Sequence, residues 1–138
     1  KWFVGDLACL PLLDQSMNLL LDIFSPANYQ EFKRVLAPDG RLIKVIPTAT
    51  HLQEIRQKVK DHLDQVDYSN EQIIQHFSDH FTIENTIHCQ ETFELTPALR
   101  EALLSMTPLL FHVDPAQIDW TDLTQITISA TILIGRSN

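Results

Sequence analysis

The chain has 138 residues, 44% hydrophobic and 20% charged, which is enough for one globular domain with a sizeable core. Its formal net charge of −8 at pH 7 argues against a self-sufficient nucleic-acid-binding domain. No apolar run is long enough to span a bilayer, and the first residues, KWFVGDL, do not form a signal peptide, so we expect a cytoplasmic protein without membrane attachment.

The first half of the chain predicts alternating strands and helices. WFVGDL (2–7) predicts a strand that is already under way at the first residues, so the chain looks like a fragment. NLLLDIF (18–24) is an apolar run typical of a strand buried on both faces of a parallel sheet. Asn28, with Glu31 three residues later, predicts a helix start. The Pro-Asp-Gly sequence at 38–40 then predicts a tight reversal into a strand at 41–47.

Two capping-box patterns follow, each with a hydroxyl residue that is followed three positions later by glutamine. The second of them begins at Ser69. The first begins at Thr50 and is accompanied by apolar residues at helical spacing, namely Leu52, Ile55, Val59 and Leu63. Each pattern predicts a helix whose first turn is capped by the hydroxyl.

The last third of the chain predicts two strands and two further helices. Residues 81–95 and 126–134 alternate with period two, as half-buried strands do. Between them, Thr96-Pro97 and Asp114-Pro115 each predict a helix with proline at its first position. We therefore expect an α/β fold with parallel strands followed by a mixed or antiparallel C-terminal pair. With only three glycines, the chain lacks a phosphate-cradling glycine loop.

The basic residues, the cysteines and two of the histidines can each be explained without a binding site. Residues 33–60 hold seven bases and two acids (+5), whereas residues 61–101 hold nine acids and one arginine (−8). The basic stretch is either a phosphate-facing patch or a set of solvated helix faces, and only clustering on one face would make a patch. Cys9 and Cys89 lack zinc-ligand spacing, so we expect two reduced, mostly buried thiols. His76 and His80 stand four apart without a third ligand, which favours a solvated helix face over a metal site.

Several short motifs combine between residues 4 and 47. Asp6 precedes Leu7, Ala8 and a Leu-Pro-Leu triplet, DQSM precedes the second strand, and RVLAPDG precedes the next. Together they resemble the second half of the class I S-adenosyl-L-methionine-dependent methyltransferases, whose partial Rossmann-like sheet we then expect here. In that family the equivalent acid meets the adenine of the cofactor. The resemblance implies that Asp6, Leu7 and Ala8 bind cofactor, while a turn-forming aspartate is the alternative.

A narrower resemblance involves IFSP (23–26), the pattern P-x-x-x-H-L-x-E (47–54) and LLSMTPLLF (103–111). These are similar to motifs of the 23S ribosomal-RNA guanine-N1 methyltransferases. The resemblance implies methyl transfer by direct displacement to N1 of a guanine in 23S rRNA. Residues 1–138 would then be the C-terminal part of the catalytic domain of a larger enzyme. Two alternatives stay open: a small-molecule methyltransferase, and a non-catalytic fragment that self-associates.

The resemblance also implies roles for residues at the strand ends. Asp22, or a main-chain carbonyl near Ser25, would accept the proton that leaves guanine N1. Phe24 would stack on the cofactor or on a flipped base, with core packing as the alternative. His51 would lie near the cofactor or the base, or be a simple first-turn helix residue. The substrate-binding candidates are Pro26, Met106, Thr107, Pro108 and Phe111, although a proline-terminated helix end would give the same string at 106–108.

Three parts of the family pattern have no counterpart in this chain: the N-terminal zinc module, the glycine-rich loop and the acid that ends strand two. We therefore expect S-adenosyl-L-methionine to bind these residues weakly or not at all, with zinc confined to the module upstream. In the complete fold the strand at 18–24 pairs with a strand that precedes this chain. An open apolar sheet edge results, which we expect another copy of the chain, as a homo-oligomer, or the WFVGDL segment to cover.

Overall fold

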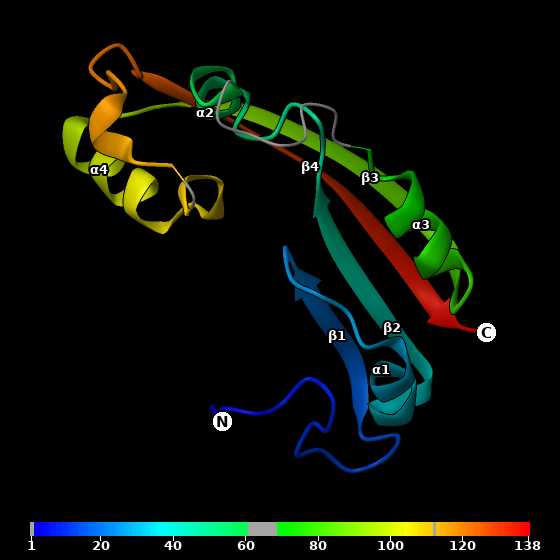
Figure 1. Ribbon diagram of the computed structural model, residues 1–138. Helices are drawn as coiled ribbons and strands as arrows, with labels where there is room; N and C mark the ends of the chain where they lie inside the picture. The colour runs from blue at the N-terminus through cyan, green and yellow to red at the C-terminus, as the bar shows by residue number, and fades with distance from the viewer. Residues whose placement is uncertain (1, 61–68, 112) are drawn as a thin grey trace. The chain divides into compact units, whose positions relative to one another are not determined.

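The computed structural model describes residues 2–60, 69–111 and 113–138 (Figure 1). The strands are β1 (Met17–Ile23), β2 (Leu36–Pro47), β3 (Phe81–Glu94) and β4 (Gln125–Ser137), and the α-helices are α1 (Tyr29–Val35), α2 (Gln53–Lys58), α3 (Glu71–Ser78) and α4 (Pro97–Met106). Short 3-10 helices span Pro108–Leu110 and Pro115–Gln117. Within the described ranges, no helix is both long and apolar enough to cross a membrane.

The four strands form one sheet in the order β1-β2-β4-β3 (Figure 1). β1 and β2 are parallel, with Leu20 opposite Leu42. β3 and β4 are antiparallel, since the Leu95 N–H donates to the Thr124 carbonyl at one end and the Asn138 N–H donates to the His80 carbonyl at the other. The predicted α/β fold, with parallel strands followed by an antiparallel C-terminal pair, is confirmed.

The chain divides into two compact units, each with its own core. The first unit comprises Lys1–Pro47, Asn70–His88 and Thr131–Asn138, and the second comprises Thr48–Ser69 and Cys89–Ala130. In the first core, α1 and α3 pack on one face of the sheet through Tyr29, Phe32, Leu36, Leu42, Ile46, Phe77, Phe81 and Leu133. The second core contains Leu52, Ile55, Val59, Leu110, Val113, Leu123 and Ile126.

The predicted strand at residues 2–7 is wrong. This segment forms only an isolated bridge between Asp6 and Cys9, and Trp2 and Val4 are fully exposed. A strand is stable when a neighbouring strand pairs its backbone groups, and the described sheet places none beside this segment. The local β propensity of residues 2–7 is therefore not enough to form a strand.

β1 forms where predicted, but its burial on both faces is wrong. Leu19, Leu21 and Ile23 are 50%, 61% and 55% exposed, whereas Asp22 on the opposite face is buried. The reason is that β1 is the edge strand of the described sheet and the first core lies on one face only. The buried thiols are also wrong, since Cys9 and Cys89 are both exposed.

Three of the predicted helix caps form and two do not. Asn28 accepts from the Glu31 N–H at the start of α1, and Thr96 accepts from the Leu99 N–H at the start of α4. The caps at Thr50 and Ser69 are wrong, because α2 begins after Leu52 and α3 begins after Asn70, neither with a side-chain cap. The Thr50 hydroxyl instead donates to Gln90. Leu63 lies outside the described residues, and Asp114 caps a 3-10 helix.

The Pro-Asp-Gly sequence lies within β2 and does not precede it. Between the paired positions Met17–Leu36 and Leu19–Arg41, β1 advances two residues and β2 advances five. The extra residues form an irregularity in which Gly40 approaches β1 closely. A Cβ at Gly40 would lie 3.0 Å from the Met17 carbonyl oxygen and 2.9 Å from a Leu36 methyl group. This close approach requires glycine.

Candidate functional site

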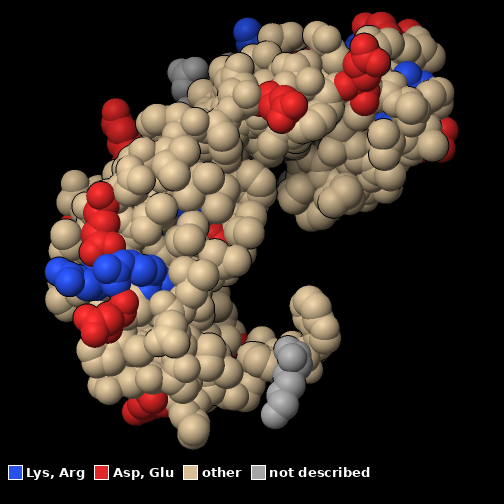
Figure 2. Space-filling view, turned by 180° about the vertical axis from the view of Figure 1, so that it is seen from behind, with Lys and Arg blue, Asp and Glu red and all other residues tan. Residues whose placement is uncertain are grey.

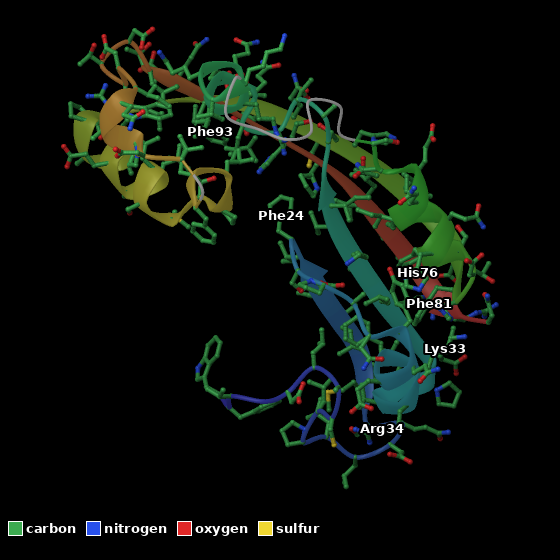
Figure 3. The ribbon with its side chains drawn as sticks, viewed as in Figure 1. Phe24, Lys33, Arg34, His76, Phe81 and Phe93 are labelled. Atoms are coloured by element: carbon green, nitrogen blue, oxygen red, sulfur yellow. The ribbon has the colours of Figure 1, made fainter. Side chains whose placement is uncertain are left out.

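The turn that follows β1 has a strained backbone. Phe24 adopts the left-handed conformation with φ 50°, and its N–H donates to the Val45 carbonyl at 3.0 Å. Figure 3 shows Phe24 at the end of β1, and the side chain is 48% exposed. This backbone conformation costs a non-glycine residue about 1–2 kcal/mol, and such outliers gather at functional sites. The carboxyl ends of parallel strands are also where α/β folds bind ligands.

A buried ion pair supports this turn. Asp22 and Lys44 are register partners on β1 and β2, each is 4% exposed, and Lys44 Nζ lies 2.6 Å from Asp22 Oδ2. The Ser25 hydroxyl donates to Asp22 Oδ1 at 2.5 Å, and Lys44 Nζ donates to the Ser25 carbonyl at 3.1 Å. Both carboxylate oxygens of Asp22 are therefore engaged, a geometry that suits positioning better than proton transfer.

Tyr29, at the start of α1, is buried and belongs to the first core. Burial raises the pKa of its hydroxyl to about 12, and the negative charge of Asp22 adds to the effect. The hydroxyl therefore stays protonated at neutral pH. The rings of His76 and His80 lie 4.9 Å and 5.2 Å from the Tyr29 ring. Among the residues that the structure describes, no group of three or more His, Cys, Asp or Glu side chains could hold a metal ion.

The segment that contains Asp6, Leu7 and Ala8 is attached to α1. Asp6 Oδ1 accepts from the Ala8 N–H at 2.9 Å, which closes a turn. The Leu7 carbonyl accepts from the Asn28 side chain at 3.2 Å. Because Asn28 follows the Ser25-Pro26 turn by two residues, the structure brings the predicted adenine-binding loop and the start of α1 together.

Arg34, on α1, holds the following residues of this segment (Figure 3). Its guanidinium donates to the carbonyls of Leu10 and Leu12 and pairs with Glu31 and Asp14. The hydrogen bond with Glu31, then that with Asp14, raises the pKa of Arg34. The hydrogen bond with Arg34 lowers the pKa of Glu31, which also accepts from the Leu10 N–H.

In the second unit, two side chains of the predicted 47–54 motif bind β4. His51 Nδ1 accepts from the Ser129 N–H at 3.2 Å, so the neutral imidazole carries its proton on Nε2. Burial and the charge of Arg56 lower the pKa of His51. Glu54 accepts from the Thr127 N–H at 2.9 Å and from the Thr127 hydroxyl at 2.6 Å. Burial opposes ionisation of Glu54, but these hydrogen bonds outweigh it and lower its pKa.

The 106–111 candidates lie at the end of α4, also in the second unit. Met106 and Phe111 are 71% and 69% exposed, and Pro108 opens a 3-10 helix. Thr107 is buried, and its hydroxyl has no hydrogen-bond partner in the described part of the chain. The exposed pair offers apolar surface, and the Thr107 hydroxyl keeps an unused donor and acceptor.

The basic stretch at 33–60 does not stand apart from acidic residues. Of its seven bases, four pair with carboxylates in the structure: Arg34, Arg41, Lys44 and Lys58. On the face shown in Figure 2, basic side chains lie next to acidic ones. The interpretation as locally neutralised surface charges is therefore better supported than a phosphate-facing patch.

Sequence reasoning missed Lys44 and the contacts of Arg34. A signal for Lys44 was present, because LIKVI and NLLLDIF each carry one charged residue, of opposite sign, inside an apolar run. In adjacent parallel strands such residues can pair. No comparable signal points to the binding of backbone carbonyls by Arg34, since that contact joins residues more than twenty positions apart.

Comparison with known proteins shows to which proteins the chain is related. No family model matches the sequence. The chain is 33% identical, over 97% of its length, to a Bacillus subtilis protein with the provisional name 23S rRNA (guanine-N(1)-)-methyltransferase. The chain is a relative of the 23S rRNA guanine-N1 methyltransferases. A second such methyltransferase, the 23S rRNA (guanine(748)-N(1))-methyltransferase of Streptomyces fradiae, is 26% identical over 92% of the chain. The chain spans about half the length of these methyltransferases, 49% and 47%.

Solved structures share the fold of this methyltransferase relative. A provisionally described methyltransferase of Bacillus halodurans matches with a TM-score of 0.53 and 14% identity, over 96% of this chain and 69% of that one. The MccD protein matches with a TM-score of 0.54 and 17% identity, over 100% of this chain and 68% of that one. The expected class I methyltransferase fold is confirmed.

Proposed function

We propose that the protein to which this chain belongs transfers a methyl group from S-adenosyl-L-methionine to N1 of a guanine in 23S rRNA, in the cytoplasm. The observation that carries the proposal is the similarity over 97% of the chain to a protein provisionally named for this reaction. The strained turn at Phe24, at the carboxyl end of a parallel strand, supports the proposal because it offers a place for a base.

The chain supplies residues for only one part of the cofactor, the adenine end. Asp6 keeps one carboxylate oxygen beyond the one that accepts from Ala8, which suits the adenine amino group, with Leu7 and Ala8 beside it. The three glycines of the chain form no loop for the methionine end. Upstream residues would therefore complete the cofactor site, and upstream cysteines would hold any zinc. The sulfonium of S-adenosyl-L-methionine supplies an electrophilic methyl group.

The protein's main contribution is then alignment of the acceptor nitrogen with the methyl group. Phe24 would stack on the target base, beside Ser25 and Pro26. His51 would lie near the cofactor or the base. Met106, Thr107, Pro108 and Phe111 would contact the RNA. The N1 proton must leave as the methyl group arrives. The acceptors that the sequence predicted for it, Asp22 and the Ser25 carbonyl, are both engaged by Lys44. We therefore assign Asp22 to positioning and leave proton transfer to solvent.

The test uses the full-length protein with radiolabelled S-adenosyl-L-methionine and 23S rRNA. N1 lies on the base-pairing edge of guanine, so its methylation stops reverse transcriptase at a single position. We expect label in 23S rRNA together with such a stop. Label in RNA without a stop would contradict attack at N1. Label that appears only in the small-molecule fraction of a cell extract would favour a small-molecule methyltransferase.

We also expect the 138-residue chain alone to self-associate through β1, because Leu19, Leu21 and Ile23 expose apolar surface on an edge strand. Leu21→Lys should shift the mass measured by light scattering from oligomer towards monomer. Leu13→Lys is the matched control, since Leu13 is 80% exposed outside the sheet. A monomeric wild-type chain at micromolar concentration would refute this expectation.

A further inference from the structure

We infer that Lys44 is a positioning residue that, through Asp22 and Ser25, fixes the Phe24 turn in the conformation that receives the target base. The inference deepens the proposed function and rests on it. Lys44 itself is buried, so its effect passes through the residues that it binds.

The first step is the placement of two opposite charges by strand register. Asp22 and Lys44 face each other on neighbouring parallel strands, and both side chains lie on the face that the first core covers. Charges in such a position are retained only when each is paired and hydrogen-bonded. Here the two side chains satisfy each other at 2.6 Å.

The second step is the attachment of Ser25 at two points. Its hydroxyl donates to Asp22 at 2.5 Å, and its carbonyl accepts from Lys44 at 3.1 Å. The ion pair therefore binds both the side chain and the main chain of Ser25, the residue that follows Phe24. Neither contact belongs to the regular hydrogen-bond ladder of the sheet.

The third step concerns Phe24, which lies between these attachments. Its N–H is held by the Val45 carbonyl at 3.0 Å, and Val45 directly follows Lys44. Phe24 is thus fixed from both sides in a left-handed conformation that an aromatic residue otherwise avoids. Without the hydrogen bonds that join Ser25 to Asp22 and Lys44, the turn is free to return to a more common backbone conformation.

The last step separates positioning from stability. A buried ion pair can often be replaced by apolar residues of similar volume without loss of stability, whereas removal of one partner leaves an uncompensated charge. The pair is therefore more informative as a device that selects one conformation. This distinction provides the test, because an apolar replacement should keep the fold and lose the turn.

The experiment compares the full-length wild-type protein with the double variant Asp22→Leu/Lys44→Met. We expect the double variant to retain the urea midpoint of unfolding and the KM for S-adenosyl-L-methionine. We expect kcat/KM for 23S rRNA to fall about 5- to 30-fold, because a released Phe24 would leave the left-handed conformation and the population of the base-receiving turn would fall by that factor. Arg41→Met is the matched control, since it removes the ion pair with Glu84 from the same strand without touching the turn. It should leave kcat/KM unchanged.

A second measurement does not depend on methylation. Chymotrypsin cleaves after phenylalanine, so we expect cleavage after Phe24, followed by mass spectrometry, to be faster in the double variant than in the wild type and in Arg41→Met. A double variant that methylates 23S rRNA within twofold of the wild type would overturn the inference. If the wild type methylates no RNA, the proposed function fails; equal cleavage rates in all three proteins would then overturn the positioning role by itself.

Discussion

Replacement of Phe77 by alanine is expected to lower the free energy of unfolding by about 3–5 kcal/mol, the usual cost of removing a fully buried phenylalanine. Phe77 is 0% exposed, and its ring lies 5.5 Å from Phe81 and 5.9 Å from Tyr29. The space that it occupies exists because position 135 is glycine. A Cβ there would lie 2.7 Å from the Phe77 ring, so the site is tightly packed and cannot collapse easily.

The measurement is urea unfolding of the 138-residue chain, followed by circular dichroism. Phe111→Ala is the matched control, because the same side chain is removed from a position that is 69% exposed. We expect it to change the free energy of unfolding by no more than about 0.5 kcal/mol. Equal losses in the two variants would show that Phe77 does not anchor the first core.

Replacement of Phe24 by alanine is expected to reduce kcat/KM for 23S rRNA methylation by about 5- to 150-fold, which corresponds to the roughly 1–3 kcal/mol of one base–aromatic stack. The side chain is 48% exposed at the end of β1. Its removal should therefore cost little stability. The assay uses the full-length protein under single-turnover conditions, with unfolding measured in parallel.

Phe3→Ala is the control for this prediction, since Phe3 is an aromatic residue of the same unit with similar exposure, 53%. It should methylate at the wild-type rate. A Phe24→Ala protein that keeps full activity but loses several kcal/mol of stability would identify Phe24 as a packing residue, the alternative interpretation of its aromatic ring.

The elements that were predicted correctly depend on local sequence. β1, β3 and β4 follow from apolar runs or period-two alternation, and α1 and α4 follow from caps whose oxygens bind an N–H three residues away. The failed helix cap at Thr50 has a long-range cause. Thr50 has the same cap pattern as Thr96, but its hydroxyl donates to Gln90, forty residues further along. Long-range partners of this kind compete with the local cap, and no local pattern reveals them.

In the candidate site, too, local motifs were predicted and long-range contacts were not. The motifs pointed to Asp6, Phe24 and Ser25, and the similarity over nearly the whole chain confirms the relationship to methyltransferases that those motifs indicated. Lys44 was not among the predicted site residues, although it holds the turn on which two of them lie. The Phe24→Ala variant and the Asp22→Leu/Lys44→Met double variant test the roles of the stacking and positioning residues separately.

The sequence by itself determined β1, β3 and β4, three helix caps and the relationship to methyltransferases, because these depend on residue types a few positions apart or on motifs that persist along the chain. Only the tertiary structure decided that Asp22 pairs with Lys44 and that Glu54 binds Thr127, 22 and 73 positions apart. Such pairs form because strand register and helix packing bring distant residues to one place, where a buried charge must find a partner.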